Sequence, residues 1–366
     1  QLNRQPSSHP HKSEIPGAAS CPSSSRRDWN TLNLLSLGDG QTSARALSPG
    51  PACAIIAPLL ANASGKTGPS EDALEPMNEL KLGIPKGSLE EATISLFRQA
   101  GWEIRSQSRN YFPSIDDPEI SCALVRSQEM PMYVGRGNLD LGLTGLDWML
   151  ESEFEVEEVC DLVYSKNSDQ PCRWVLVVPE DSPIQSVKDL RGKKIATELV
   201  RFTRRYLAER DIDCDVEFSW GATEAKAVGG LVDAVVEITE TGNTIRAHGL
   251  RIVSDLLHTH TRLISNREAL ADPWKKQKIE QISLLLRASL QARQQVALKM
   301  NAPEARLEEI VALLPSLHAP TVSQLSEKGW VALETVVDNH LIRDLIPKLR
   351  ERGAEGILEY DLRKIV

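Results

Sequence analysis

Short aliphatic runs alternate with helical stretches from Leu80 onward, and this alternation restricts the fold more than any other feature of the chain. Residues 81–85, 122–125, 139–143 and 194–196 have the composition of short buried strands. Between the first two runs, apolar residues recur at helical spacing. Strands that alternate with crossover helices pair in parallel, so the pattern predicts an α/β fold.

The alternating pattern divides into two lobes, and a different pattern follows it. The turn at 179–183 begins and ends with proline and suggests that a second lobe starts at residue 178. We expect residues 79–177 and 255–284 to form the first lobe and residues 178–254 to form the second. Residues 285–366 follow a strand–helix–strand–strand–helix–strand order, which predicts a ferredoxin-like (ACT-like) α+β domain.

The first 78 residues differ in composition from the rest of the chain. They are rich in Ser, Pro, Ala, Gly and Arg, and they show no sustained hydrophobic periodicity. Such a segment buries too little apolar surface to fold, so residues 1–78 are predicted to be disordered. This composition is also typical of an organellar transit peptide, which favours a plastid (chloroplast stroma) location. The alternative is a disordered tail or mistranslated upstream sequence on a cytoplasmic protein.

Charge and cysteine content exclude several classes of partner. The formal net charge of −9 argues against non-specific binding to nucleic acid or to an anionic membrane. The longest apolar stretch, 52–63, is too short to span a bilayer. The six cysteines show no C-x-x-C spacing, so we expect reduced thiols and neither a zinc site nor a disulfide framework.

The stretch 230–249, GLVDAVVEITETGNTIRAHG, indicates the chemistry most directly. An aliphatic strand leads into the polar turn 239–244, after which a helix begins. Backbone N–H groups and the helix dipole attract an anion at such a turn. Asp233 and Glu237 precede it, and carboxylates accept hydrogen bonds from a diol, so the pattern suggests a ribose 5-phosphate. An ordinary strand–turn–helix connection capped by Thr is the alternative.

Several further motifs occur together with this turn in a fixed order. They are LGIPKGSL (82–89), LDLGLTG (139–145), GKKIATELVRFTRRY (192–206), SWGATEAK (219–226), the TETGNT turn, and APTVSQL with GWVALETVV (319–325, 329–337). On these motifs, residues from about 80 to 366 resemble the long form of ATP phosphoribosyltransferase, the first enzyme of histidine biosynthesis. Together with the N-terminal composition, the resemblance is to the plant, plastid-like members.

The resemblance implies a bilobal, periplasmic-binding-protein-like catalytic core with a C-terminal regulatory domain. The family transfers phosphoribosyl from phosphoribosyl pyrophosphate to N1 of ATP and releases pyrophosphate, with magnesium (Mg2+) as cofactor. It further implies L-histidine as feedback inhibitor and a homo-hexamer built from dimers. A divergent non-catalytic regulatory paralogue and a small-molecule binding protein of periplasmic-binding-like fold are the alternatives.

The family motifs also assign roles to residues of this chain. The resemblance implies catalytic roles for Lys86, Asp233 and Glu237, and no residue is assigned as a direct metal ligand. The implied substrate-binding residues are Gly87, Asp140, Leu141, Gly142, Thr144, Thr239, Glu240, Thr241, Gly242, Asn243 and Thr244. The implied effector-binding residues are Asn301, Leu317, Thr321 and Thr335. The chain departs from the family pattern at Ser88, Arg201 and His248, where the family usually has Arg, Asn and Asn.

Overall fold

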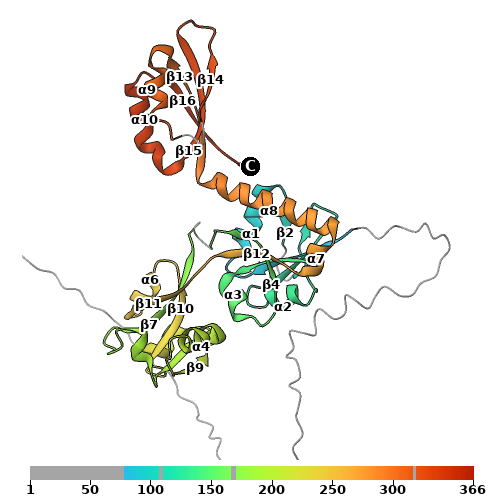
Figure 1. Cartoon of the computed structure of the whole chain (residues 1–366), viewed down its shortest axis with the longest axis vertical. Coiled ribbons are helices and arrows are strands. Elements are labelled where there is room, and N and C mark those ends of the chain that lie inside the picture. The colour runs from blue at the N-terminus through green and yellow to red at the C-terminus, as the bar shows by residue number, and fades with distance from the viewer. Residues whose placement is uncertain (1–77, 107–109, 166–169, 316–318) are drawn as a thin grey trace, which may run out of the picture. The chain divides into compact units, whose positions relative to one another are not determined.

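The computed structural model describes residues 78–106, 110–165, 170–315 and 319–366. The predicted disorder and transit peptide at 1–78 therefore lie, apart from Asn78, outside the described residues, as does Leu317. Three units follow one another along the described part of the chain, each built around its own sheet (Figure 1). Two are α/β lobes and the third is an α+β domain, as predicted.

The first lobe is built on a five-stranded sheet with the order β4-β1-β5-β12-β6. Its strands are β1 (Leu80–Lys86), β4 (Ile120–Arg126), β5 (Leu141–Gly145), β6 (Glu157–Leu162) and β12 (Thr261–Ser265). Strand β1 pairs in parallel with both β4 and β5, whereas β12 runs antiparallel to β5 and β6. The carboxyl ends of β1, β4 and β5 therefore lie at one edge of this sheet.

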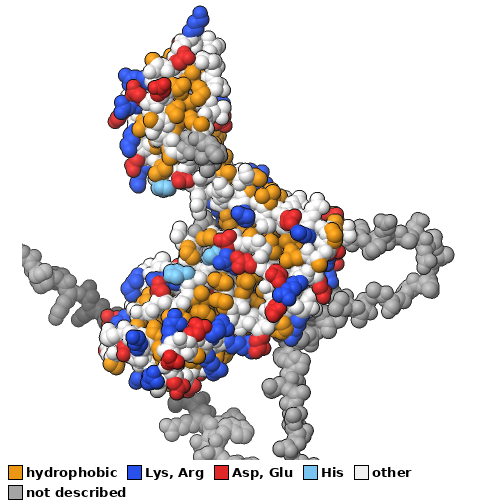
Figure 2. Space-filling view, viewed as in Figure 1, with side chains coloured by type: hydrophobic (Ala, Val, Ile, Leu, Met, Phe, Trp, Pro, Cys, Tyr) orange, Lys and Arg blue, Asp and Glu red, His pale blue; other side chains and the backbone are white. Residues whose placement is uncertain are grey.

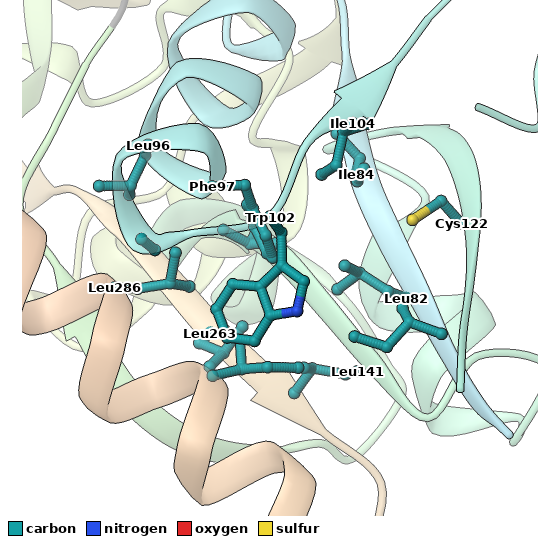
Figure 3. Close-up of a cluster of buried hydrophobic side chains, with 14 of the residues drawn as sticks. Leu82, Ile84, Leu96, Phe97, Trp102, Ile104, Cys122, Leu141, Leu263 and Leu286 are labelled. Carbon is teal, nitrogen blue, oxygen red and sulfur yellow. The ribbon is translucent and has the colours of Figure 1, made fainter. Parts of the chain in front are cut away.

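Helices and a small hairpin complete the first lobe. They are α1 (Glu90–Ala100), β2 (Ile104–Arg105), β3 (Ser114–Ile115), α2 (Met130–Gly135), α3 (Leu146–Glu151), α7 (Arg267–Ala271) and α8 (Pro273–Arg293). Figure 3 shows Phe97 and Trp102, at the end of α1, packed with Leu82 of β1 and Leu286 of α8. Helix α8 begins sharply because Asp272 accepts the N–H groups of residues 274 and 275 and Pro273 occupies its first position.

The second lobe is built on a separate five-stranded sheet with the order β11-β7-β10-β8-β9. Its strands are β7 (Cys172–Pro179), β8 (Lys194–Thr197), β9 (Asp215–Phe218), β10 (Ala234–Thr239) and β11 (Leu250–Thr259). Its helices are η3 (Val187–Leu190), α4 (Val200–Ala208), α5 (Thr223–Val228) and α6 (Asn243–Ala247). Strands β10, β8 and β9 are parallel, so their carboxyl ends share one edge.

The boundaries of the second lobe differ from the predicted 178–254. Strand β7 pairs with β10 and β11, and β11 continues to Thr259, so this sheet spans residues 172–259. The prolines at 179 and 183 mark the end of the first strand of the second lobe, not the passage between lobes. The chain enters this lobe after β6 and leaves it before β12, which gives the bilobal, periplasmic-binding-protein-like core that the resemblance implied.

The C-terminal domain has a four-stranded sheet with the order β14-β15-β13-β16, in which every pair is antiparallel. Its elements are β13 (Gln295–Pro303), η4 (Glu304–Arg306), α9 (Leu307–Val311), β14 (Thr321–Gln324), β15 (Trp330–Asp338), η5 (Asn339–Leu341), α10 (Ile342–Glu351) and β16 (Glu355–Asp361). This order confirms the ferredoxin-like prediction. Helix α8 runs through the predicted boundary at 285, so the domain begins after Arg293.

The described surface carries charges of both signs (Figure 2). Figure 2 shows basic and acidic side chains interspersed over the visible face, without a large patch of one sign. No helix in the described ranges is long and apolar enough to cross a membrane. The four described cysteines, at 122, 160, 172 and 214, are free.

Candidate active site

The carboxyl edge of the second sheet brings together three of the sequence motifs. Val236 of β10, Thr197 of β8 and Phe218 of β9 lie side by side in the ladder. The chain continues from this level into the turn 239–244, into Glu198 and into Ser219-Trp220. Ligands of open α/β sheets bind outside the carboxyl ends of the strands. This edge is therefore the candidate active site of the second lobe.

The turn 239–244 has the strand–turn–helix geometry that the sequence predicted. The N–H of Gly242 donates to Oγ1 of Thr239 at 2.8 Å, which closes the turn. Gly242 has φ +75°, a left-handed conformation that side chains with a Cβ rarely adopt. An added Cβ would lie 3.1 Å from the Arg246 guanidinium and from Ile252. Glycine is therefore required both by the backbone conformation and by the limited space.

Arg246, which sequence reasoning did not assign, adds a positive charge to this turn. Its guanidinium donates to the carbonyl of Thr241 at 3.2 Å and to the side-chain oxygen of Asn243 at 2.6 Å. Arg246 lies on α6, one helical turn after Gly242, and this spacing was the signal available in the sequence. A guanidinium held at the turn by these two oxygens favours the binding of a phosphate.

Glu237 lies on β10, two residues before the turn, and its carboxyl is only partly accessible to solvent. Burial is the main cause that raises its pKa to about 7, and repulsion by Glu224 and Glu198 adds to the effect. Hydrogen bonds from the N–H of Ile238 and from Thr223 act in the opposite direction. The carboxyl groups of Glu198, Glu224 and Glu237 thus lie close together at this edge. Such a cluster is suited to accept hydrogen bonds from the hydroxyl groups of a ligand or to contact a cation that the ligand carries.

Glu198, which follows β8, has contacts from both lobes. Its carboxyl accepts hydrogen bonds from the side chain of Gln128, beyond the end of β4, and from the N–H of Gly221. Burial, partly offset by these bonds, raises its pKa. The contact with Gln128 places Glu198 beside the carboxyl edge of the first sheet.

Lys86 ends β1 at the carboxyl edge of the first sheet. Its ammonium lies 3.7 Å from the centre of the Tyr111 ring, which orients the side chain. Helix α1 begins at Glu90, and Gly87, between Lys86 and this helix, has φ +111°. Two glutamates occupy the first turn of α1, so their negative charge makes this helix end less favourable for an anion. Ser88 is exposed.

Thr144 also lies near the carboxyl edge of the first sheet, but it is fully buried. Its hydroxyl donates to the carbonyl of Ser127 at 2.8 Å. This bond fixes the backbone just before Gln128, the residue that contacts Glu198. The Thr144 hydroxyl therefore contacts the backbone next to the site and not the open edge itself.

The other three residues of that motif do not lie at the site. Asp140 stands at the opposite edge of the sheet, where its carboxylate accepts the N–H of Lys81 at 2.9 Å and the ammonium of Lys275 at 2.7 Å. Leu141 is buried in the core. Gly142 leaves room for Met130 of α2, whose sulfur would lie 2.7 Å from an added Cβ. The predicted contacts of Asp140, Leu141 and Gly142 with substrate are therefore wrong.

Asp233 is likewise separated from the turn that it was expected to share. It precedes β10 at the amino edge, where it accepts the N–H of Lys194 at 2.9 Å and the ammonium of Lys193 at 3.2 Å. The bond from the Lys194 N–H is the main cause that lowers its pKa. At about 3.3 Å per residue, six residues of strand separate Asp233 from Thr239 by about 20 Å. The predicted pairing of Asp233 with Glu237 at one ribose is therefore wrong.

The expected effector residues lie on two faces of the C-terminal sheet. Asn301 and Thr321 pair with Ala332 and Glu334 on its open face. Thr335 pairs with Leu298 and is buried on the helix-covered face, so it does not share a site with them within one chain. Strand spacings put Asn301 and Thr321 about 12 Å apart.

A magnesium site made of protein groups alone does not fit these residues. In the ranges that the structure describes, no three His, Cys, Asp or Glu side chains are arranged to hold a metal ion. Mg²⁺ usually binds through one or two carboxylates together with substrate phosphates and water. The carboxylates at 198 and 237 fit that second mode of binding.

Comparisons with known proteins show which family this chain is similar to. A family model described as ATP phosphoribosyltransferase (HisG) matches residues 126–288, and one described as the HisG C-terminal domain matches residues 292–364. A curated ATP phosphoribosyltransferase from Desulfatibacillum aliphaticivorans is 58% identical over 287 residues, 78% of this chain and 98% of the relative. Another, from Solidesulfovibrio magneticus, is 59% identical over 289 residues, 79% of this chain and 99% of the relative.

One solved structure also matches over most of its length. A chain in an ATP phosphoribosyl transferase (HisG:HisZ) complex from Thermotoga maritima has a TM-score of 0.50 and 27% identity. The match covers 58% of this chain and 98% of that chain. It supports both the bilobal fold and the family.

The relatives contradict the plant-like, plastid prediction. The ATP phosphoribosyltransferases that match at 55–59% identity come from bacteria such as Desulfatibacillum, Solidesulfovibrio and Geobacter, which have no plastids. The prediction rested on a Ser- and Arg-rich composition, which a transit peptide shares with other weakly folding segments. With both family models and these relatives in agreement, the chain belongs to the ATP phosphoribosyltransferase family, whose members are pentosyltransferases.

Proposed function

We propose that the carboxyl edge of the second sheet binds phosphoribosyl pyrophosphate, and that N1 of ATP attacks C1 of its ribose there. In this step the bond from C1 to the pyrophosphate oxygen breaks as the bond from C1 to N1 forms. The ring nitrogen already has a lone pair, so the enzyme mainly positions two polyanions and stabilises charge. The closed turn 239–244 is the observation that carries this assignment.

The 5-phosphate is assigned to the turn because hydroxyl, amide and guanidinium groups follow one another closely along it. Thr239, Thr241, Asn243 and Thr244 supply polar side chains, Glu240 contributes its backbone N–H, and Gly242 permits close approach of the phosphate. Arg246 supplies the positive charge beside these groups. Backbone N–H groups, hydroxyls and a guanidinium are the donors that proteins use for phosphate.

Glu237 is assigned to the ribose hydroxyls. It lies two residues before the phosphate turn on the same strand, so a ribose attached to the 5-phosphate comes within its reach. A carboxylate there accepts hydrogen bonds from the hydroxyls and faces the positive charge that develops on the sugar. A pKa of about 7 means that ligand binding must favour the ionised form of Glu237.

Lys86 and Mg²⁺ are assigned to the remaining phosphates. Lys86 and Gly87 lie at the carboxyl edge of the first sheet, where an ammonium suits the phosphate groups of ATP or pyrophosphate. Mg²⁺ would arrive with pyrophosphate and be held in part by the carboxylates of Glu198 and Glu237. When bound, it neutralises the leaving pyrophosphate.

The C-terminal domain is proposed to sense L-histidine and to contribute to a homo-hexamer. Asn301 and Thr321 lie on the open face of its sheet, and Leu358 and Tyr360 are about half exposed on the same face, at 49% and 52%. Exposed apolar side chains on an open sheet favour contact with another subunit. A second subunit packed on this face would supply the contacts to histidine that the separated effector residues of one chain cannot make together.

Two carboxylates of one strand provide the test. Glu237→Gln and Asp233→Asn are compared with the wild type for pyrophosphate release from ATP and phosphoribosyl pyrophosphate with Mg²⁺. Loss of a hydrogen bond to a charged group costs about 1.5–3 kcal/mol, so we expect Glu237→Gln to lower kcat/KM for phosphoribosyl pyrophosphate by about 10- to 150-fold. Asp233→Asn should stay within a few-fold of the wild type. Equal losses in the two variants would contradict the assignment.

A further inference from the structure

Trp220 is an exposed aromatic residue at the carboxyl edge of the second sheet. Its side chain is 82% exposed, whereas Trp102 and Trp174 are 7% and 1% exposed. A Trp side chain in water leaves a large apolar surface unpaired, which is unusual for a folded protein. Phe218, two residues earlier, is 53% exposed, and its ring centre lies 5.6 Å from that of Trp220. The two rings form an exposed aromatic pair at the end of β9.

The backbone around Trp220 is held on both sides. The N–H of Ser219 donates to the carbonyl of Thr197 at 2.9 Å, and the Ser219 hydroxyl lies 2.9 Å from that of Thr223 in the protein interior. Gly221 and Ala222 then both adopt left-handed conformations, with φ of +68° and +48°. The left-handed conformation strains the backbone at Ala222, because its Cβ approaches the following carbonyl, and proteins retain such strain mainly at functional sites. Trp220 is thus presented by a fixed loop.

Trp220 lies at a suitable distance from the proposed phosphate site. Strand β9 is separated from β10 by β8 alone, so the two strand ends are about 10 Å apart at the usual spacing of neighbouring strands. Glu198, at the end of β8, accepts the N–H of Gly221 and lies between the two. A ribose bound beside the turn 239–244 would therefore lie on the same sheet edge as Trp220, two strands away.

We propose that the indole of Trp220 stacks on the adenine of ATP and presents N1 to the ribose, with Phe218 supporting the indole. The proposal rests on the function proposed above, because the transfer requires adenine beside C1. Stacking on an aromatic ring is suited to a purine, and polar groups at the same edge remain available for the sugar and the phosphates.

The test measures ATP binding by calorimetry and both KM values with the full chain. Trp220→Ala should weaken ATP binding and raise KM for ATP by about 5- to 150-fold, the usual range for loss of a stacked base. KM for phosphoribosyl pyrophosphate should not change. Trp220→Phe keeps a ring and should stay within a few-fold of the wild type. Leu231→Ala removes a side chain that is 69% exposed near the opposite edge, and it should change neither constant.

Two results would overturn the stacking role. One is an unchanged ATP affinity in Trp220→Ala. If light scattering then also shows a change in oligomeric state, the ring belongs to a contact between subunits. The other is a rise only in KM for phosphoribosyl pyrophosphate. If the wild type binds ATP but releases no pyrophosphate, the proposed function fails, and the calorimetric comparison of the variants still decides whether Trp220 stacks on the base.

Discussion

Glu237→Gln should make the protein more stable while it impairs the enzyme, and the gain in stability should depend on pH. Burial and the two neighbouring glutamates raise the pKa of Glu237 from 4.5 to about 7 in the folded protein. Below 4.5 the group is protonated in both the folded and unfolded states. As pH rises through 4.5 to 7, the unfolded state loses its proton first, so the free energy of unfolding falls. The neutral amide of Gln removes this loss.

The size of the effect follows from the shift. The rise in the pKa of Glu237 from 4.5 to about 7 lowers the free energy of unfolding by about 3 kcal/mol when the group is fully ionised. At pH 5 the group is almost fully protonated in the folded state, and the corresponding cost is below about 1 kcal/mol. Glu237→Gln should therefore raise the free energy of unfolding by about 2.5 kcal/mol more at pH 8 than at pH 5.

Urea unfolding at fixed protein concentration, followed by circular dichroism at pH 5 and pH 8, measures this difference. Asp233→Asn is the matched variant on the same strand, and its expected sign is opposite. The pKa of Asp233 is lowered, so its carboxylate stabilises the folded state above its unfolded pKa, and stability is lost as pH falls. Asp233→Asn should therefore destabilise the protein at pH 8. An equal change for Glu237→Gln at both pH values, or a loss of stability at pH 8, would refute the reasoning.

Three further predictions concern other parts of the chain. Gly242→Ala forces a Cβ into a left-handed turn at a cost of about 1–2 kcal/mol, so KM for phosphoribosyl pyrophosphate should rise about 5- to 30-fold in steady-state assays. Asp140→Asn should lower the free energy of unfolding by about 1–3 kcal/mol in urea titrations and leave both KM values unchanged. Deletion of residues 294–366 should abolish inhibition by histidine in the pyrophosphate-release assay while ATP binding, measured by calorimetry, is retained.

Most of the fold could be predicted from the sequence, because the elements of all three units follow local patterns. The buried runs at 82–84 and 234–236 are aliphatic, and each lies within a strand. The passage between the lobes was harder to predict, because β7 enters the second sheet without a change of hydrophobic pattern. Its membership depends on pairing with β10 and β11, which are distant in sequence. Prolines locate a turn, but they do not show which sheet a strand joins.

The site was predicted less completely, because similar chemistry occurs at both ends of a strand. Asp140 and Asp233 each precede a strand, accept the N–H of a lysine on the neighbouring strand and pair with a lysine ammonium. In sequence, such a carboxylate resembles a ligand of the sugar, since it lies within the same motif as the site. Only the direction of the strand separates it from Glu237. Polar residues after a strand were therefore better candidates than polar residues before it.

Arg201 illustrates the same principle for a departure from the family pattern. The family usually has Asn at this position, and here Glu151 at the end of α3 accepts the N–H groups of Arg201 and Phe202 at 3.0 and 2.9 Å. A carboxylate at this helix end satisfies the donors that would otherwise attract a phosphate. The Arg201 guanidinium lies 2.8 Å from Glu153, also next to α3. Arg201 thus belongs to the contact between α3 and α4, where its backbone and its guanidinium are both engaged by glutamates.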